Sequence, residues 1–127
     1  MDLFERLRIL YIERDTATQS IMHNILRKST LSVHTARSPQ KALRILTKVS
    51  PDLVLTELWI PTPQDGIALT QEIKAHYPDI PVFIHSWEDP GQYGLVADGY
   101  LPKPLMFGEL EKVFRRILKQ KHAAAEL

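Results

Sequence analysis

Short apolar runs alternate along the chain with longer segments whose apolar residues recur at helical spacing. The short runs predict strands at residues 8–12, 31–36, 52–55, 80–84 and 100–101. The longer segments predict helices at residues 16–28, 66–76 and 109–121, and a further helix that begins at Ser38 and Pro39. This alternation predicts an α/β fold, a three-layer, doubly wound sheet of five parallel strands.

Length and composition narrow the class of protein. The chain has 127 residues, enough for one domain, which we place at residues 1–121; residues 122–127 are expected to form a C-terminal tail with little to bury. The net charge of +1 does not suggest a dedicated nucleic-acid binder, and the absence of cysteine excludes disulfides, thiolate catalysis and Cys-ligated zinc. No long apolar stretch opens the sequence, so we expect a cytoplasmic protein without a signal peptide or membrane span.

Polar residues stand at or just after the ends of four of the predicted strands. In an open parallel sheet, sites form at the carboxyl ends of the strands, close to the point where the strand order reverses. These side chains are therefore expected to meet in one cluster, which comprises Glu13, Arg14, Glu57, Ser86 and Lys103.

Several stretches fit one known pattern in the right order and near the right spacing. They are residues 9–15 (ILYIERD), 51–57 (PDLVLTE), 61 with 65–66, 80–82 (IPV) and 98–104 (DGYLPKP). With these motifs the chain resembles a response-regulator receiver domain, of the CheY-like fold, from about residue 7 to residue 118. The resemblance implies a flavodoxin-like sheet and a role in two-component, or phosphorelay, signal transduction.

The resemblance also assigns positions to the site. The family holds Mg²⁺ with two acidic residues after the first strand and phosphorylates an Asp after the third. Glu13 matches the first acidic position, Ser86 the hydroxyl that contacts the phosphoryl group, and Lys103 the lysine that pairs with it. Tyr100 matches the aromatic residue that changes rotamer on activation.

Two positions depart from this pattern. Arg14 stands at the second acidic position, where its positive charge should repel Mg²⁺, and Glu57 stands at the phosphoacceptor position with one methylene too many. Phosphoryl transfer needs a metal to neutralise the developing charge and an aligned nucleophile. We therefore expect no catalytic residue, no bound metal and no cofactor. Trp59 and Trp87 are expected to narrow the pocket.

Two arrangements of the altered site are open. In one, the guanidinium of Arg14 takes the place of the metal, and Glu57 extends toward Arg14 and Lys103. In the other, Arg14 points into solvent and Glu57 simply pairs with Lys103.

The segment between Ser86 and Lys103 is shorter than in typical receivers by roughly one helical turn. Pro90, Gly91 and Gly94 are poor residues for a helix interior, so we expect the fourth helix of the family to be shortened or replaced by a loop. The alternative is a two-turn helix that begins at Pro90. Receivers commonly dimerise or dock partners at this face, so its loss should change the partner.

Two weaker signals have ordinary explanations. The last predicted helix is basic, which fits a solvated face better than a nucleic-acid patch; its cations are Arg115, Arg116, Lys119 and Lys121. His85 ends the fourth strand near the pocket, and a packed, neutral histidine is expected rather than a pH-sensitive member of the cluster.

Three functions fit this sequence to different degrees. The first is a bacterial pseudo-receiver that is not an enzyme and acts without phosphorylation through a protein partner, a fused output domain or a homodimer, and not through nucleic acid or membrane. The second is a receiver phosphorylated with Mg²⁺ at a non-standard residue such as Asp15 or Ser86. The third, a flavodoxin-like cofactor protein, is remote because residues 16–20 offer hydroxyls but no glycine for a phosphate loop.

Overall fold

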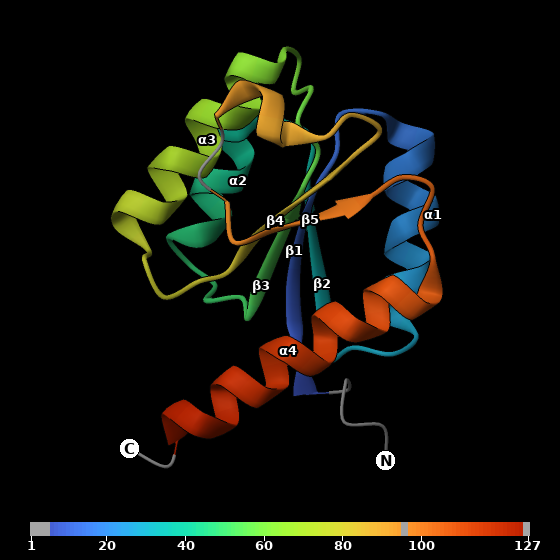
Figure 1. The fold of residues 1–127 in the computed structure, drawn as a ribbon, viewed down its shortest axis with the longest axis vertical. Coiled ribbons are helices and arrows are strands. Elements are labelled where there is room, and N and C mark those ends of the chain that lie inside the picture. Colours follow the sequence, from blue (N-terminus) through green and yellow to red (C-terminus); the bar gives the residue numbers. More distant parts are fainter. Residues whose placement is uncertain (1–5, 95–96, 126–127) are drawn as a thin grey trace.

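A computed structural model of the protein describes residues 6–94 and 97–125, and the side chains of this part except those of residues 124 and 125. Strands and helices alternate as the sequence predicts (Figure 1). The elements in chain order are β1 (Arg8–Ile12), α1 (Thr16–Arg27), β2 (Ser32–Ala36), α2 (Pro39–Leu46), β3 (Leu53–Thr56), α3 (Pro63–His76), β4 (Val82–Ser86), the short 3₁₀ helix η2 (Pro90–Tyr93), β5 (Gly99–Pro102) and α4 (Phe107–Ala125).

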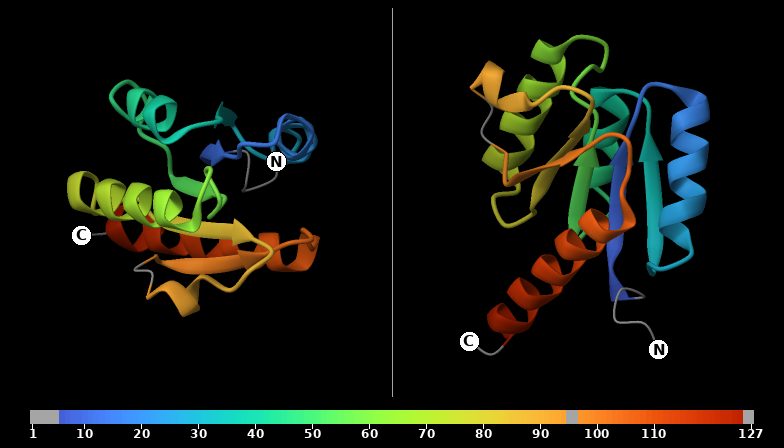
Figure 2. Two further views of the ribbon diagram at one scale, coloured as in Figure 1. Left: turned by 90° about the horizontal axis from the view of Figure 1, so that it is seen from above. Right: turned by 45° about the vertical axis from the view of Figure 1, so that its right-hand side comes forward.

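All five strands pair in parallel in the order β2-β1-β3-β4-β5. Two apolar clusters flank this sheet. One joins the sheet to α1 and α4, and the other joins it to α2 and α3. The helices therefore cover both faces (Figures 1 and 2), and the predicted three-layer α/β fold is confirmed.

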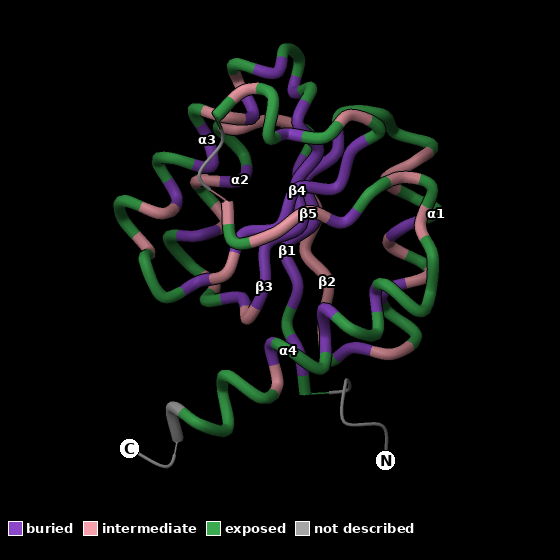
Figure 3. Tube along the Cα trace, viewed as in Figure 1, coloured by how far each residue is buried: buried purple, intermediate pink, exposed green. Residues whose placement is uncertain are grey.

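The central strands carry the core. Every residue of β3 and β4 is buried, as the continuous apolar character of the third run predicts (Figure 3). The order β2-β1-β3 places β1 between β2 and β3, so the chain reverses direction across the sheet at β1 and β3. The carboxyl ends of these two strands are where a site is expected.

Two helices are longer than the sequence analysis predicted. α3 begins at Pro63 instead of Gly66, because the Thr62 hydroxyl accepts the backbone N–H of Asp65 and the Asp65 carboxylate accepts that of Thr62. α4 continues past Lys121 through Ala125, so the first residues of the predicted tail extend this helix. None of the helices in the described part of the chain is long and apolar enough to cross a membrane.

The predicted shortening of the fourth helix is confirmed for the described residues. Only η2, a single four-residue 3₁₀ turn, lies between Ser86 and β5 in that part of the chain. Asp89 caps it, and Gly94 ends it in the left-handed conformation at φ 64°, which a glycine adopts without strain. Residues 95 and 96 of the predicted loop lie outside the described residues.

Candidate functional site

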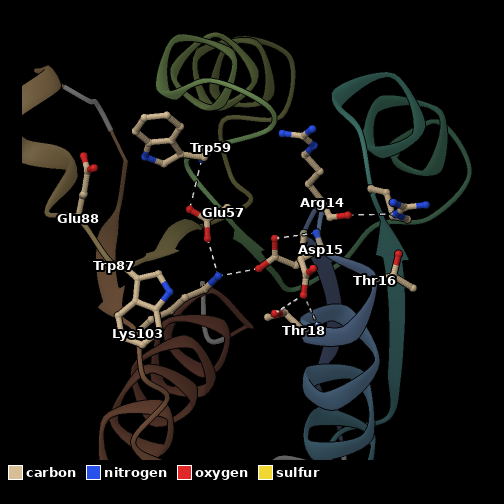
Figure 4. Close-up of a pocket in the computed structure, with 11 residues that line it drawn as sticks. Arg14, Asp15, Thr16, Thr18, Glu57, Trp59, Trp87, Glu88 and Lys103 are labelled. Atoms are coloured by element: carbon tan, nitrogen blue, oxygen red, sulfur yellow. Dashed lines mark hydrogen bonds and ion pairs between the residues drawn. The ribbon is translucent and has the colours of Figure 1, made fainter.

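Three charged side chains meet at the carboxyl ends of β1, β3 and β5. Lys103 Nζ donates to Glu13 Oε1 at 2.6 Å and to Glu57 Oε2 at 2.5 Å (Figure 4). Both carboxylates are buried, at 3% and 7% exposure for Glu13 and Glu57. The predicted convergence of these strand ends is therefore observed, and one ammonium group bridges two carboxylates.

The remaining carboxylate oxygens also have donors. Glu57 Oε1 accepts the backbone N–H groups of Leu58 at 2.8 Å and Trp59 at 3.2 Å. Glu13 Oε2 accepts the backbone N–H of Asp15 at 3.2 Å. Hydrogen bonds to all four oxygens hold both side chains in place.

Lys103 stays protonated in this environment. Burial disfavours its charge, but hydrogen bonds to Glu13 and Glu57 outweigh that effect, and the pKa of Lys103 is raised above its ordinary value. Its backbone N–H donates to the carbonyl of Ser86 at 2.9 Å, which fixes the start of the loop after β5. The cluster is thus a fixed ammonium between two fixed carboxylates.

Arg14 does not take part in this cluster. Figure 4 shows its side chain directed away from Glu57 and Lys103, and the residue is exposed. Its carbonyl accepts a hydrogen bond from Arg37 Nε at 3.1 Å. The hypothesis that the Arg14 guanidinium replaces the metal is therefore wrong in this structure. Lys103 already bridges both carboxylates, and the guanidinium keeps its hydration at the surface.

Ser86 and Tyr100 lie outside the pocket lining. The Ser86 hydroxyl is fully buried and donates to the carbonyl of Glu88 at 2.6 Å. The Tyr100 hydroxyl donates to the carbonyl of Ser86 at 3.0 Å. Both polar groups thus hold the chain after β4, and neither points a free hydroxyl at Glu57.

An open cavity of about 690 Å³ lies above the three charged side chains. Trp59 and Trp87 line it, but they are 46% and 70% exposed, so they stand at its mouth. Both indoles thus contribute to the pocket wall, and the narrowing of the pocket by them stays a prediction. Trp87 directly follows β4, and Trp59 lies shortly after β3 (Figure 4). The other lining residues are Glu13, Arg14, Asp15, Thr16, Thr18, Arg37, Glu57, Glu88 and Lys103.

The capping role of Asp15 is not among the predictions made from the sequence. This residue caps α1, and its carboxylate accepts the hydroxyl of Thr18 at 2.6 Å and the backbone N–H of Thr18 at 2.8 Å. These hydrogen bonds lower the pKa of Asp15. An Asp three residues before a Thr at a helix start is a capping signal that could have been read from the sequence.

Two buried polar rings lie close together on the β1 and β4 strands. The centroids of the Tyr11 and His85 rings are 6.3 Å apart. The Nδ1 of His85 is 2.8 Å from the carbonyl oxygen of Leu101, so this nitrogen carries the proton of the neutral ring. Burial lowers the pKa of His85, which supports the packed, neutral histidine that was expected. The Tyr11 hydroxyl is buried without a hydrogen-bond partner in the described part of the chain.

The donor set does not resemble a metal site. Within residues 6–94 and 97–125, no group of three or more His, Asp or Glu side chains is placed to hold a metal ion. Glu13 and Glu57 face an ammonium group, and Arg14 offers donors where a carboxylate would be needed. The residues present therefore do not fit the Mg²⁺ that the family resemblance implies.

Known proteins match most of this chain. A family model described as the response regulator receiver domain matches residues 9–115. The chain is 30% identical over 123 residues to the transcriptional regulatory protein PrrA of Mycobacterium leprae, covering 93% of this chain and 52% of PrrA. It is 33% identical over 103 residues to the DNA-binding transcriptional regulator NtrC of Klebsiella pneumoniae, covering 77% of this chain and 22% of NtrC.

A solved structure shows the same architecture. The crystal structure of a response regulator receiver domain protein from Clostridium thermocellum superposes with a TM-score of 0.78 at 25% identity, covering 94% of this chain and 99% of that one. Against PrrA, in contrast, the chain spans about half of the relative's length.

Proposed function

The chain belongs to the response regulator receiver domains of two-component signalling, and we propose that it acts there without phosphorylation, through contacts with another protein or domain. The bridge from Lys103 to Glu57 and Glu13 carries this proposal. A receiver that is switched by phosphorylation needs a free carboxylate and a divalent cation beside it. Here the side chain that carries the carboxylate, Glu57, is one methylene longer, and the ammonium group of Lys103 is paired with it.

The chemistry of phosphoryl transfer supports this reading. An attacking carboxylate oxygen has to lie in line with the leaving group, and a metal has to neutralise the charge on the phosphoryl oxygens. Both oxygens of Glu57 already accept hydrogen bonds, from Leu58, Trp59 and Lys103. Attack through Glu57 would break this network. Position 14 carries an arginine, so it offers no second carboxylate to hold the metal.

Phosphorylation at a non-standard residue is the second candidate. Ser86 is a poor acceptor because its hydroxyl is buried and bonded to a carbonyl. Asp15 is exposed beside the cavity, which favours it over Ser86, but its carboxylate is held by Thr18. Asp15 is therefore the residue on which this alternative would rest.

Relatives suggest what the domain signals to. PrrA and NtrC are transcriptional regulators by description, and both are much longer than this chain. We propose that the domain controls an output region or a separate protein in the same way that a phosphorylated receiver does, from the cytoplasm and with no catalytic activity of its own. The shortened face around η2 would give it a partner different from those of typical receivers.

The proposal is tested by incubating the protein with acetyl phosphate and Mg²⁺ and measuring the intact mass. We expect no adduct under conditions that phosphorylate a receiver with an Asp acceptor, which serves as the positive control. A stoichiometric, hydroxylamine-labile adduct would refute the proposal. Repeating the reaction with Asp15→Asn and Glu57→Gln variants would then identify the acceptor.

A further inference from the structure

In the cavity above Lys103, the acidic side chains accept hydrogen bonds within the protein, whereas two of the basic side chains have no ion-pair partner among the described residues. Its four acidic side chains all have donors within the protein: Glu13 and Glu57 share Lys103, Asp15 accepts from Thr18, and Glu88 accepts from Gln92 and Tyr93. Two of its three cations do not have a partner of this kind. Among the described residues, neither Arg14 nor Arg37 makes an ion pair.

The two arginines both line the cavity, and one hydrogen bond joins them. Arg14 follows β1 and Arg37 follows β2, and Arg37 Nε donates to the backbone carbonyl of Arg14 at 3.1 Å. This bond positions Arg37 and leaves the terminal nitrogens of both guanidinium groups for other acceptors. Guanidinium groups bind carboxylates and phosphates in a bidentate way.

The opposite side of the cavity is aromatic. Figure 4 shows Trp59 and Trp87 on one side of the Glu57–Lys103 pair and Arg14 on the other. The two indoles are 46% and 70% exposed. Exposed large aromatic side chains at the edge of a cavity present faces on which a planar ring can stack.

The floor of the cavity decides where an anion would lie. Glu13 and Glu57 against Lys103 leave the floor with one net negative charge, and the full lining carries four carboxylates and three cations. An anion is therefore repelled from the two carboxylates of the floor, and the attraction available to it is local, at Arg14 and Arg37. The volume of about 690 Å³ falls within the range of about 300–1,000 Å³ that small-molecule sites occupy.

We propose that this cavity binds a small aromatic anion, whose carboxylate or phosphate is held by Arg14 and Arg37 and whose ring stacks on Trp59 and Trp87. The protein would then be a receiver domain whose pocket binds a small-molecule ligand. This inference does not depend on whether the domain can be phosphorylated, because neither arginine and neither indole takes part in the Lys103 bridge.

The test uses naphthyl phosphate as the probe. Inorganic phosphate and naphthol, the two parts of this probe, are tested separately, and naphthoate tests a carboxylate in place of the phosphate. Trp59 and Trp87 are the two tryptophans of the chain, so the two indole N–H signals in an ¹⁵N-correlated NMR spectrum both report from the mouth of the cavity. We expect both signals to shift saturably with naphthyl phosphate or naphthoate. Binding should be at least about tenfold tighter than with either half alone.

Variants separate the proposed site from adventitious binding. Arg14→Gln with Arg37→Gln should weaken binding at least about tenfold and reduce its dependence on salt. Arg27→Gln with Arg44→Gln removes the same charge from exposed positions outside the cavity and should leave the affinity unchanged. Trp59→Leu, followed through the signal of Trp87, should also weaken binding.

Three outcomes would overturn the inference: no saturable shift at millimolar probe, equal affinity for naphthol and naphthyl phosphate, or unchanged binding in the arginine variant. Circular dichroism of each variant shows whether the fold is kept. The acetyl phosphate experiment has a different readout, so failure of one proposal is distinguishable from failure of the other.

Discussion

Lys103 Nζ lies 2.5 Å from Oε2 of Glu57, a residue 46 positions earlier in the chain, and the two side chains are 10% and 9% exposed. A buried ion pair of this kind is a weak source of stability when compared with apolar residues, because both charges lose their hydration. Removing only one of the two charged side chains is costly, since the other charge is then left buried without a partner. The pair therefore fixes the strand ends of β3 and β5 relative to each other.

Replacing Lys103 with Met should destabilise the protein by about 3–5 kcal/mol, because Glu13 and Glu57 would face each other without a cation. Urea unfolding at neutral pH measures the change. Adding Glu57→Gln to Lys103→Met should recover a large part of the loss, since one of the two buried charges is removed.

Lys112 provides the matched control for this experiment. It pairs with Glu109 at 3.2 Å on the exposed face of α4, where ion pairs contribute at most about 1 kcal/mol. Lys112→Met should therefore be nearly neutral. An equal effect of both substitutions would contradict the structural role of the buried bridge.

His85 should make the stability of the protein sensitive to mild acid. Burial lowers the pKa of His85 in the folded state, so the fold favours the neutral ring. This contribution is complete above the ordinary pKa of 6.5, and it is lost as the pH falls from there through the lowered pKa of the folded state. The free energy of unfolding should then fall by up to about 1.4 kcal/mol per pH unit more steeply than in a His85→Asn variant.

The other four histidines are present in both proteins, so the difference between the two curves isolates His85. Urea titrations between neutral and mildly acidic pH provide the measurement. Parallel curves for the two proteins would show that His85 titrates alike in the folded and unfolded states.

Tyr11→Phe should stabilise the protein or leave its stability unchanged. The Tyr11 hydroxyl is buried without a partner in the described residues, and burying such a group costs about 1–3 kcal/mol. Thermal unfolding compares this variant with Tyr93→Phe, which removes the 2.6 Å bond from Tyr93 to Glu88 and should be slightly destabilising. A clear loss of stability in Tyr11→Phe would show that the hydroxyl has a partner, such as a bound water.

Gly66 should not tolerate a side chain, because an added Cβ would lie 2.1 Å from the backbone oxygen of Leu58. Overpacking against backbone typically costs about 1–3 kcal/mol, so Gly66→Ala should lower the free energy of unfolding by at least that amount. Gly108 is the control, since it lies in α4 with open space around its Cβ position. Gly108→Ala should be stabilising by about 0.5–1 kcal/mol, and a similar loss in both variants would contradict the close approach at Leu58.

The strand and helix pattern was predictable because it depends on local periodicity. The buried strands β3 and β4, the Ser38 cap of α2 and the poor helix formers around Pro90 all carry their signal in neighbouring residues. The pairing of Glu57 with Lys103 was also predictable, because parallel strands bring their carboxyl ends to one edge.

Side-chain directions were not predictable in the same way. Arg14 was a candidate replacement for the metal, but Lys103 reaches both carboxylates, and the competition between two cations depends on geometry that no local pattern encodes. The same holds for Trp87, which lines the pocket as its position in the sequence suggests but leaves 70% of its surface exposed. The early start of α3 differs from these cases, because the capping pattern of Thr62 and Asp65 is a local signal that stands in the sequence.

If the longer acceptor at position 57 and the missing carboxylate at position 14 prevent phosphorylation, reversing both changes should restore the reaction. Glu57→Asp shortens the acceptor to the length that the family uses, and Arg14→Asp replaces a cation with a second ligand for Mg²⁺ beside Glu13. We expect the double variant to gain a hydroxylamine-labile phosphoryl adduct from acetyl phosphate that depends on Mg²⁺, as measured by intact mass. Each single variant should react far less, because one lacks the metal site and the other the aligned acceptor.

Arg44→Asp with Glu57→Asp is the control for the change in charge, since Arg44 lies outside the cavity. A double variant that binds Mg²⁺ and stays unphosphorylated would place the cause elsewhere, and the first group to test is the Ser86 hydroxyl, which already donates to the carbonyl of Glu88.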